Sequence, residues 1–361
     1  MNSIAKMTND LKRLNHKYSH YYGVFFFIGG FLFDLLTLGR VDDTLNILSQ
    51  FFYLSLCLFF LTAELIPQDS RFKIFSLKKK WHPEATQFCL GALLSAYTIF
   101  YFKSASLSNS LLFILFIIAL LVINEMKLIK VLDYYLRISL FHICLVTFLF
   151  ILIPLLTGTL SSGDFALGIA LTLIVYLSVL TVYKKLGIAR EVILNKFLYP
   201  GVFIIAFFNF SYLLNLLPPL PLAIKKISIF HEIIKKDGDY IGRGQYPAWQ
   251  FWRQGDTPFL ADAGEKPYVF ISVFAPKGFD GRIIMHWQIY KDGQWKTSDR
   301  IPLLIKGGRE DGFRGFSFKE KWLPGDWRIL VETEDKREIG RLQFEILEDK
   351  EQRETTEDYL L

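Results

Sequence analysis

The sequence predicts a bundle of seven membrane-spanning helices followed by an all-β domain of the immunoglobulin-like sandwich type. Three observations predict this fold class. Long apolar segments fill residues 1–217, Lys and Arg gather at alternate ends of these segments, and short strand-like apolar runs replace the long ones after Pro218. The 361 residues are 52% hydrophobic and 21% charged. Because the two kinds of residue are segregated along the chain, a single soluble globule is excluded.

The first part of the chain contains the predicted spans. A bilayer core about 30 Å thick needs roughly 20 mostly apolar residues per helix. Seven segments meet or approach this length, at residues 21–39, 45–65, 86–102, 109–125, 134–156, 165–183 and 197–217. A basic stretch precedes the first segment, but no small-residue cleavage site follows it. We therefore expect residues 21–39 to remain in the protein as a signal anchor.

The placement of basic residues predicts the orientation of the spans, because Lys and Arg in short loops stay on the cytoplasmic side. With residues 1–20 in the cytoplasm, 16 of the 18 Lys and Arg residues before Pro218 are cytoplasmic, and only Arg40 and Lys103 lie outside. Positive charge interleaved with spans follows membrane topology, so the net charge of +6 does not indicate a nucleic-acid partner. Seven spans place everything after Leu217 on the extracytoplasmic face.

The second part of the chain contains the predicted β domain. Pro218, Pro219 and Pro221 end the last span, because proline has no N–H for helix propagation, and residues 218–223 are expected to form a linker. Asp292-Gly293 predicts a tight hairpin. Short runs rich in β-branched and aromatic residues predict strands within a domain of residues 224–347, at 227–230, 268–274, 283–290, 328–333 and 341–346.

Cysteine usage and composition complete the domain prediction. All three cysteines lie within predicted spans, so the β domain must be stabilised by core packing without disulfides. Trp287 and Trp327 lie within strand patterns and are expected in that core. Residues 348–361 are highly charged, and we expect a disordered tail there.

The β region resembles a bacterial family of membrane proteins of unknown function. Trp, Gly and Arg residues at matching spacings carry the resemblance, in the stretches His286-Trp287, Trp295-Lys296-Thr297-Ser298, Gly307-Gly308-Arg309, Gly312, Arg314-Gly315, Lys319, Gly325-Asp326-Trp327-Arg328 and Ile339-Gly340-Arg341-Leu342-Gln343-Phe344. It covers residues 222–346, and the seven spans resemble the long form of the family. The resemblance implies a small β domain attached to membrane segments, in a bacterial cytoplasmic (inner) membrane, and implies no activity.

Two groups of residues in the β domain are candidates for ligand binding. Trp249 and Trp252 lie in an irregular stretch and can stack on a ligand or lie in the bilayer interface. Arg309, Arg314 and Lys319 belong to a Gly-rich basic stretch that can bind an anion, such as an acidic polymer or a lipid headgroup. The alternative for this stretch, residues 306–321, is a solvated hairpin with structural ion pairs, which we favour because acidic residues are interspersed.

The sequence predicts no metal site and no cofactor. His231-Glu232 lacks the second histidine of a zinc-binding HExxH motif, and neither His231 nor His286 has a second ligand at metal-site spacing. We expect these histidines to bond to backbone or to a tyrosine. Phosphate-binding loops, G-x-S-x-G elbows, dinucleotide fingerprints and CxxC motifs are absent from the sequence, so no catalytic residue is predicted.

Three ionisable residues inside the spans are functional candidates, because charge in a bilayer is costly. Asp34 lies within the apolar run Phe31–Leu36, Glu64 lies near a cytoplasmic span end, and His142 lies within the fifth span. Their scatter over different depths favours hydrogen bonding between helices over an ion path.

These features lead to two hypotheses for function. The first is an inner-membrane protein that presents an extracytoplasmic, periplasmic β-sandwich to another envelope protein or to a cell-wall or lipid component. The alternative is a membrane-embedded enzyme or transporter with its site in the helices near Asp34 and Glu64, and with the β domain as lid or receptor. The lack of catalytic motifs favours the first hypothesis.

Overall fold

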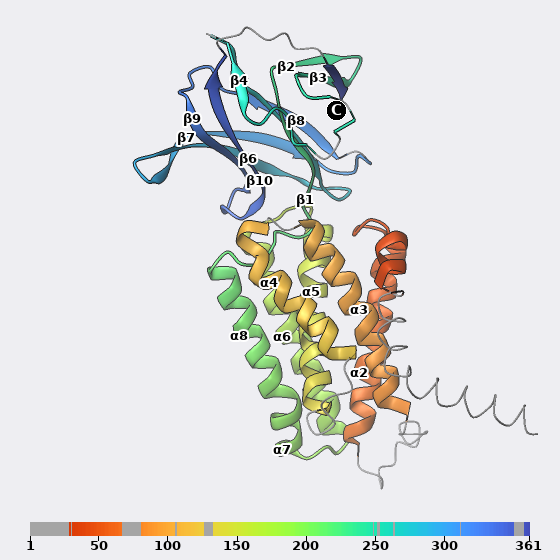
Figure 1. Ribbon diagram of the computed structural model, residues 1–361. Helices are drawn as coiled ribbons and strands as arrows, with labels where there is room; N and C mark the ends of the chain where they lie inside the picture. The colour runs from red at the N-terminus through yellow and green to blue at the C-terminus, as the bar shows by residue number, and fades with distance from the viewer. Residues whose placement is uncertain are drawn as a thin grey trace, which may run out of the picture. The chain divides into compact units, whose positions relative to one another are not determined.

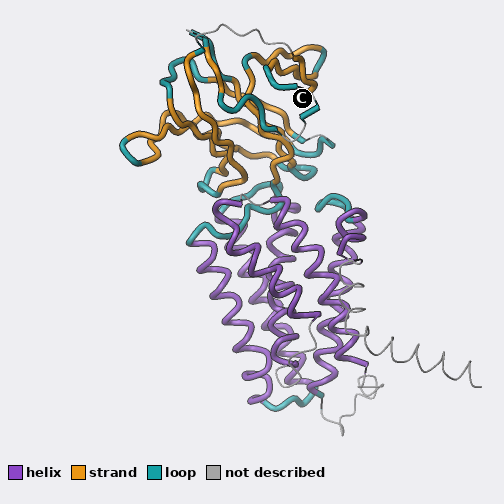
Figure 2. Tube along the Cα trace, viewed as in Figure 1, coloured by secondary structure: helices purple, strands orange, loops and turns teal. Residues whose placement is uncertain are grey.

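The computed structural model describes residues 29, 31–66, 81–104, 107–125, 133–247, 249–250, 253–262, 264–310, 312–349 and 357–361. Helices occupy the described chain up to Leu213, and strands occupy it from Ala223 onward (Figure 2). The chain forms two compact units, of which one is helical and the other contains further helical turns and all the strands. The change from helix to strand occurs at the Pro-rich stretch, as predicted.

The helical elements follow the apolar segments of the sequence. Five of these segments are helices that are long and apolar enough to cross a membrane, and they lie at the predicted second, third, fifth, sixth and seventh spans. The fourth is a shorter apolar helix, and residues 21–28 and 30 of the first lie outside the described residues. The elements are α2 (Thr44–Leu65), α3 (His82–Ser104), α4 (Leu107–Glu125), α5 (Asp133–Thr157), α6 (Ser162–Lys185), α7 (Arg190–Ile193), the π-helix η3 (Leu194–Leu198) and α8 (Tyr199–Leu213) (Figure 1).

The helices differ in how much of their apolar surface is buried by protein. Of the most apolar stretch of α5, 78% is buried, whereas the figure for α2 and for α6 is 22%. Large apolar side chains on the less buried helices are exposed, including Leu45, Phe51, Leu177, Phe203 and Phe210. Apolar surface of this extent is unfavourable in water, so these helices need apolar surroundings.

The β region is a sandwich of two sheets. The strands of the five-stranded sheet have the order β4-β10-β9-β6-β7, and those of the three-stranded sheet have the order β1-β5-β8. The strands are β1 (Ala223–Phe230), β4 (Phe259–Ala261), β5 (Tyr268–Phe274), β6 (Asp280–Lys291), β7 (Gln294–Lys306), β8 (Phe313–Phe318), β9 (Gly325–Thr333) and β10 (Glu338–Glu348) (Figure 1). All neighbours pair antiparallel except β4 and β10, which are parallel.

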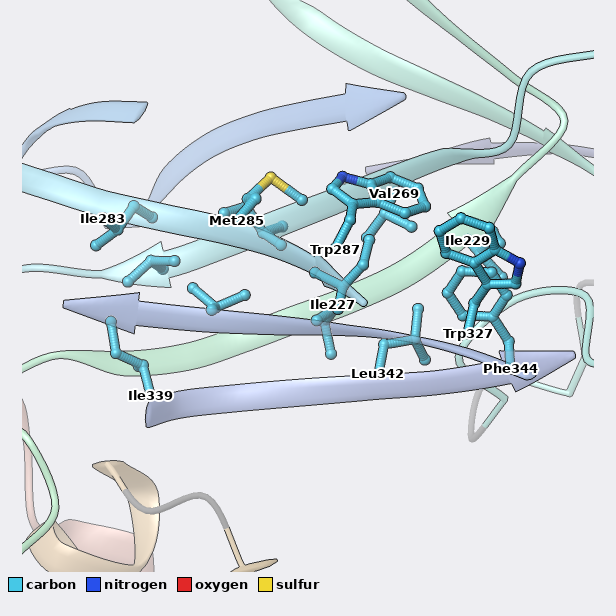
Figure 3. Close-up of a cluster of buried hydrophobic side chains, with 14 of the residues drawn as sticks. Ile227, Ile229, Val269, Ile283, Met285, Trp287, Trp327, Ile339, Leu342 and Phe344 are labelled. Atoms are coloured by element: carbon cyan, nitrogen blue, oxygen red, sulfur yellow. The ribbon is translucent and has the colours of Figure 1, made fainter. Parts of the chain in front are cut away.

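The core of the sandwich is made by alternate residues of the facing strands. Trp287 of β6 is completely buried, and Trp327 of β9 lies at a ring distance of 6.3 Å from it (Figure 3). The Trp287 indole N–H donates to Ser317 Oγ at 3.0 Å, which joins the two sheets through a buried hydrogen bond. The prediction that both tryptophans are core residues is confirmed. A core built this way is stabilised by packing of aromatic and β-branched side chains.

The β6–β7 hairpin confirms the turn predicted from Asp292-Gly293. Lys291 pairs with Gln294 across the two-residue loop. Both loop residues have positive φ, 54° for Asp292 and 77° for Gly293, as a type I′ turn requires.

A third, small sheet, which the sequence does not predict, has the strand order β11-β3-β2. It contains β2 (Glu232–Lys236), β3 (Asp239–Gly244) and β11 (Glu357–Leu360). Tyr359 of β11 stacks on Tyr246 at 4.4 Å and contacts Phe230, which is fully buried. Part of the expected disordered tail is therefore a strand, because Tyr359 completes a small aromatic core.

The Gly-rich basic stretch at residues 306–321 also differs from expectation. In place of a solvated hairpin it contains β8, which pairs along β5 from Tyr268↔Phe318 to Val273↔Phe313. Phe316 packs on Tyr240 and Tyr268. The stretch is thus part of the sandwich, and the structural ion pairs expected in it are present, between Arg314 and Asp239 and between Lys319 and Asp299.

Candidate functional site

The five-stranded sheet has two faces of different chemistry. On β6, Ile283, Met285, Trp287 and Ile289 point into the core, so the alternating residues His286, Gln288 and Tyr290 lie on the other face, here called the outer face. Strand pairing places Arg300 and Thr297 of β7 opposite His286 and Gln288, and places Arg328 of β9 opposite Gln288. The outer face thus carries adjacent polar and aromatic side chains from three strands.

A chain of hydrogen bonds runs across the outer face. The Arg328 Nε–H donates to Gln288 Oε1 at 2.6 Å, and the Gln288 amide nitrogen lies 3.2 Å from His286 Nε2. His286 Nδ1 lies 3.2 Å from Glu332 Oε1. Arg300 completes the chain through an ion pair with Glu332 at 3.2 Å. Each member is held by the next, which limits the rotamers of all five.

A β-bulge places Thr297 beside His286, the middle member of this row of hydrogen bonds. The β6–β7 register shifts between Trp287 and Gln288, because Trp287 pairs with Asp299 and Gln288 with Thr297. The extra residue, Ser298, reorients the strand, a role that bulges often have near functional sites. Thr297 Oγ1 lies 2.8 Å from His286 Nε2, and Thr297 is exposed. Its hydroxyl is therefore accessible to a ligand and held in place by a buried histidine.

Arg328 is oriented by two contacts and has no ionic partner among the described residues. Its guanidinium lies over the Trp295 ring at 4.3 Å, in addition to its bond to Gln288. Burial lowers the pKa of Arg328 and the charge of Arg341 lowers it further, while the charges of Glu338 and Glu332 partly offset this effect. Arg341 itself pairs with Glu338. The free Nη groups of Arg328 therefore carry positive charge with no carboxylate bound to them.

The residues that the sequence predicts as anion ligands are not among these outer-face residues, and two of the three form ion pairs with acidic residues. Arg314 pairs with Asp239 at 3.0 Å and also donates to the main-chain oxygen of Leu361 at 3.1 Å. Lys319 binds Asp299 and donates to Ser298 Oγ at 2.7 Å. Arg309 is exposed and does not join them. The structure therefore gives Arg314 and Lys319 structural roles, because folding brings acidic partners to them.

Of the predicted aromatic pair, Trp249 alone lies among the described residues. Trp249 is 65% exposed. Trp252 lies outside the described residues. Two other aromatic residues lie beside the polar side chains of the outer face. They are Trp295 and Tyr290, whose rings lie 5.2 Å apart.

The predicted intramembrane candidates each have a local partner. Asp34 accepts a hydrogen bond from Ser95 Oγ at 2.6 Å. Glu64 forms an ion pair with Arg137 at 2.6 Å, and His142 Nε2 donates to the Phe197 main-chain oxygen at 3.0 Å. These contacts join helices, as expected for polar groups that bond between spans.

His231 forms a second buried cluster at the end of β1. Its Nδ1 lies 2.5 Å from Glu265 Oε1 and its Nε2 lies 3.4 Å from Asp256 Oδ2, while its ring stacks on Phe259 at 4.3 Å. Burial opposes the charged form, but hydrogen bonds and charge from Asp256 and Glu265 raise the pKa of His231 to about 9. The expected backbone or tyrosine partner was wrong for His231 and for His286, since the rings of both histidines lie against other side chains, carboxylates among them. No group of three His, Cys, Asp or Glu among the described residues is arranged to hold a metal ion.

A recess of about 540 Å³ lies beside this cluster, lined by Trp322, Leu323, Glu320, Lys321 and Glu348 among others. The Trp322 indole N–H donates to the Glu265 main-chain oxygen at 2.7 Å, so the His231 cluster supports one wall. The lining charges have both signs, and Glu320 pairs with Lys266 at 2.8 Å. The lining of the recess therefore has no single sign of charge.

Sequence reasoning missed the outer face, although alternation along residues 283–290 could have found it. The apolar residues of this run alternate with His286, Gln288 and Tyr290, which places those three on one face of any strand. The partners on β7 and β9 could not be found in this way, because strand order and the bulge determine them.

The fold and the site define a class of protein, in which several helices suited to a membrane precede a β-sandwich with a polar outer face. Residues 280–346 match the family model described as "Protein of unknown function (DUF2914)". This range contains β6 to β9, most of β10 and every outer-face residue discussed above. The match agrees with the predicted resemblance to a domain of unknown function.

Two solved structures are similar to parts of the chain. An immunoglobulin-like protein from Pseudomonas aeruginosa has 17% identity over 34% of this chain and 97% of its own, with a TM-score of 0.20. A β-glucosidase from Listeria innocua has 11% identity over 25% of this chain and 15% of its own, with a TM-score of 0.18. No curated protein sequence matches the chain.

Proposed function

We propose that the protein is an integral protein of the bacterial cytoplasmic membrane that presents an immunoglobulin-like sandwich on the extracytoplasmic side as a binding module for an envelope component. The outer face is the observation that carries this proposal. A sheet face with only a structural role needs no oriented arginine lacking an ionic partner, and no accessible hydroxyl held by a buried histidine. Both features are typical of sites preorganised for a ligand.

The immunoglobulin-like assignment is supported by strand order. If β1, β5 and β8 are strands A, B and E, then β4, β10, β9, β6 and β7 correspond to A′, G, F, C and C′. The parallel pairing of β4 with β10 matches that of A′ with G. Trp287 of β6 then occupies the strand C position at which immunoglobulin domains bury a tryptophan.

Seven spans and an extracytoplasmic sandwich are supported by the lengths of the helices and by the basic residues between them. The exposed apolar side chains of α2, α6 and α8 suit contact with lipid chains. A binding role is favoured over catalysis because the sequence contains no phosphate-binding loop, G-x-S-x-G elbow, dinucleotide fingerprint or CxxC motif.

Fusions to reporter proteins test the topology. Alkaline phosphatase, which is active only outside the cytoplasm, is expected to be active when fused after Leu361, and green fluorescent protein is expected to be dark when exported unfolded at the same position. A fusion within the segment at residues 184–196 should give the opposite result. A fluorescent fusion after Leu361 would contradict the proposed orientation.

Crosslinking in intact cells tests the binding role. A photoreactive residue at exposed Leu304, on β7 of the outer face, is expected to crosslink to an envelope component, and Thr297→Ala with Arg300→Ala should reduce the yield at least fivefold. The same residue placed at Trp249 is the matched control. If the Leu304 crosslink forms equally in the double variant, the outer face is not the binding surface.

A further inference from the structure

Arg328 differs from its neighbours on the outer face in its ionic contacts. Arg300 pairs with Glu332 at 3.2 Å, and Arg341 pairs with Glu338. Among the described residues, no carboxylate forms an ion pair with Arg328, and Glu338 and Glu332 attract its charge only at longer range. A partly buried guanidinium without a contacting carboxylate is stabilised when an anion binds to it.

The contacts of Arg328 fix the orientation of its guanidinium and leave two of its nitrogens able to bind a ligand. The Nε–H is used by Gln288, and the guanidinium plane is held against Trp295. The two Nη groups remain, and together they form the fork that binds two oxygens of a carboxylate or phosphate. Because Gln288 is itself fixed through His286 and Glu332, little side-chain freedom is lost when an anion binds.

The groups beside Arg328 suit a saccharide. Thr297 offers an exposed hydroxyl whose oxygen can accept a hydrogen bond from a sugar hydroxyl. Tyr290 is 44% exposed, and its ring offers an apolar face for the C–H side of a sugar ring. Tyr290 pairs with Trp295, and Gln288 pairs with both Thr297 and Arg328. These groups therefore lie at neighbouring positions about 5–10 Å apart, which is the length of one or two sugar rings.

We propose that the outer face is a binding site for an acidic saccharide, in which Arg328 binds the carboxylate or phosphate group and Thr297 and Tyr290 contact the sugar. This inference rests on the proposed binding role and names the chemistry of its ligand. The binding groups lie on the face of the sheet and not along its β7 edge, which suits a saccharide better than a peptide, whose main chain would pair with a strand edge.

Binding of the full chain in detergent to immobilised oligogalacturonate tests the proposal. The expected result is saturable binding that weakens at least tenfold when the carboxylates are methyl-esterified. Arg328→Gln should weaken binding by a similar factor, and Arg328→Lys should also, because lysine retains the charge but lacks the fork. Arg309→Gln, an exposed arginine of the same domain, is the matched control and should leave binding unchanged.

Further probes distinguish the sources of the anion and the kind of polymer. Arg328-dependent binding to a phosphorylated mannan in place of oligogalacturonate would identify the anion as phosphate and support the site. Four results would each overturn the acidic-saccharide proposal. The esterified probe or polyglutamate could bind as well as oligogalacturonate does, Arg328→Gln could bind as well as wild-type protein does, or neither saccharide could bind. Near-ultraviolet circular dichroism of the variants confirms that the sandwich remains folded.

The assay is independent of the tests of the proposed function. Membrane orientation does not affect binding by purified chain, so a failed topology test leaves this result interpretable. If both saccharides fail to bind while the Leu304 crosslink still depends on Thr297 and Arg300, the binding role stands and only the ligand chemistry is wrong.

Discussion

Replacing Trp287 with alanine is expected to lower the free energy of unfolding of the β-sandwich by about 3–5 kcal/mol, the range for removal of a large buried aromatic side chain. Trp287 is fully buried and contacts the rings of Trp327 and Phe344 (Figure 3). Its removal leaves a cavity between the sheets and also leaves the Ser317 hydroxyl, which is buried, without its donor. A domain without disulfides has no crosslink to limit this loss.

Pulse proteolysis of the full chain in detergent, over a series of urea concentrations, measures the change. Trp249→Ala is the matched control, because the side chain is 65% exposed and its loss should change the free energy of unfolding by less than about 0.5 kcal/mol. Equal effects of the two substitutions would show that the tryptophan at position 287 is not part of the core.

The stability of the β region is expected to fall as pH rises, through His231. The pKa of His231 is raised to about 9 in the folded protein, above the value of about 6.5 for an unperturbed histidine. Because the folded state binds the proton more tightly, this stabilisation is complete below pH 6.5, declines as pH rises through 9, and is lost above it. The shift corresponds to roughly 3 kcal/mol.

Comparison of wild-type protein with His231→Asn between pH 6 and pH 10 isolates this contribution. We expect the variant to be less stable at pH 6, because Asp256 and Glu265 lose their shared cation, and the difference from wild type to shrink as pH rises. A difference that stays constant over this pH range would contradict the assignment of a charged His231 to the cluster.

Much of the fold follows from local patterns in the sequence. The predicted run 268–274 coincides with β5, and those at 283–290 and 341–346 lie within β6 and β10. The turn at Asp292-Gly293 was predictable because its positive φ values depend only on the two residues present. The strands β2, β3, β8 and β11 were missed because glycine, charge or turn residues interrupt their apolar pattern, and pairing with a neighbour stabilises them.

The candidate site was less predictable than the fold. Arg314 and Lys319 were sensible anion ligands on composition alone, but Asp239 is 75 residues from Arg314 and Asp299 is 20 residues from Lys319. Whether a basic side chain is free or paired depends on which acidic residue lies opposite it. Local sequence does not specify that relation.

The sequence by itself determined where apolar helices give way to strands, which tryptophans are buried and where the main hairpin turns. Each of these follows from the length of an apolar run, from alternation along one strand or from the backbone preference of two residues. The tertiary structure decided that His286 meets Glu332 from 46 positions away, that Arg328 lies over Trp295, and that residues 357–360 form a strand. The physical reason is that strand order and register, which result from packing of the whole sandwich, determine which side chains become neighbours.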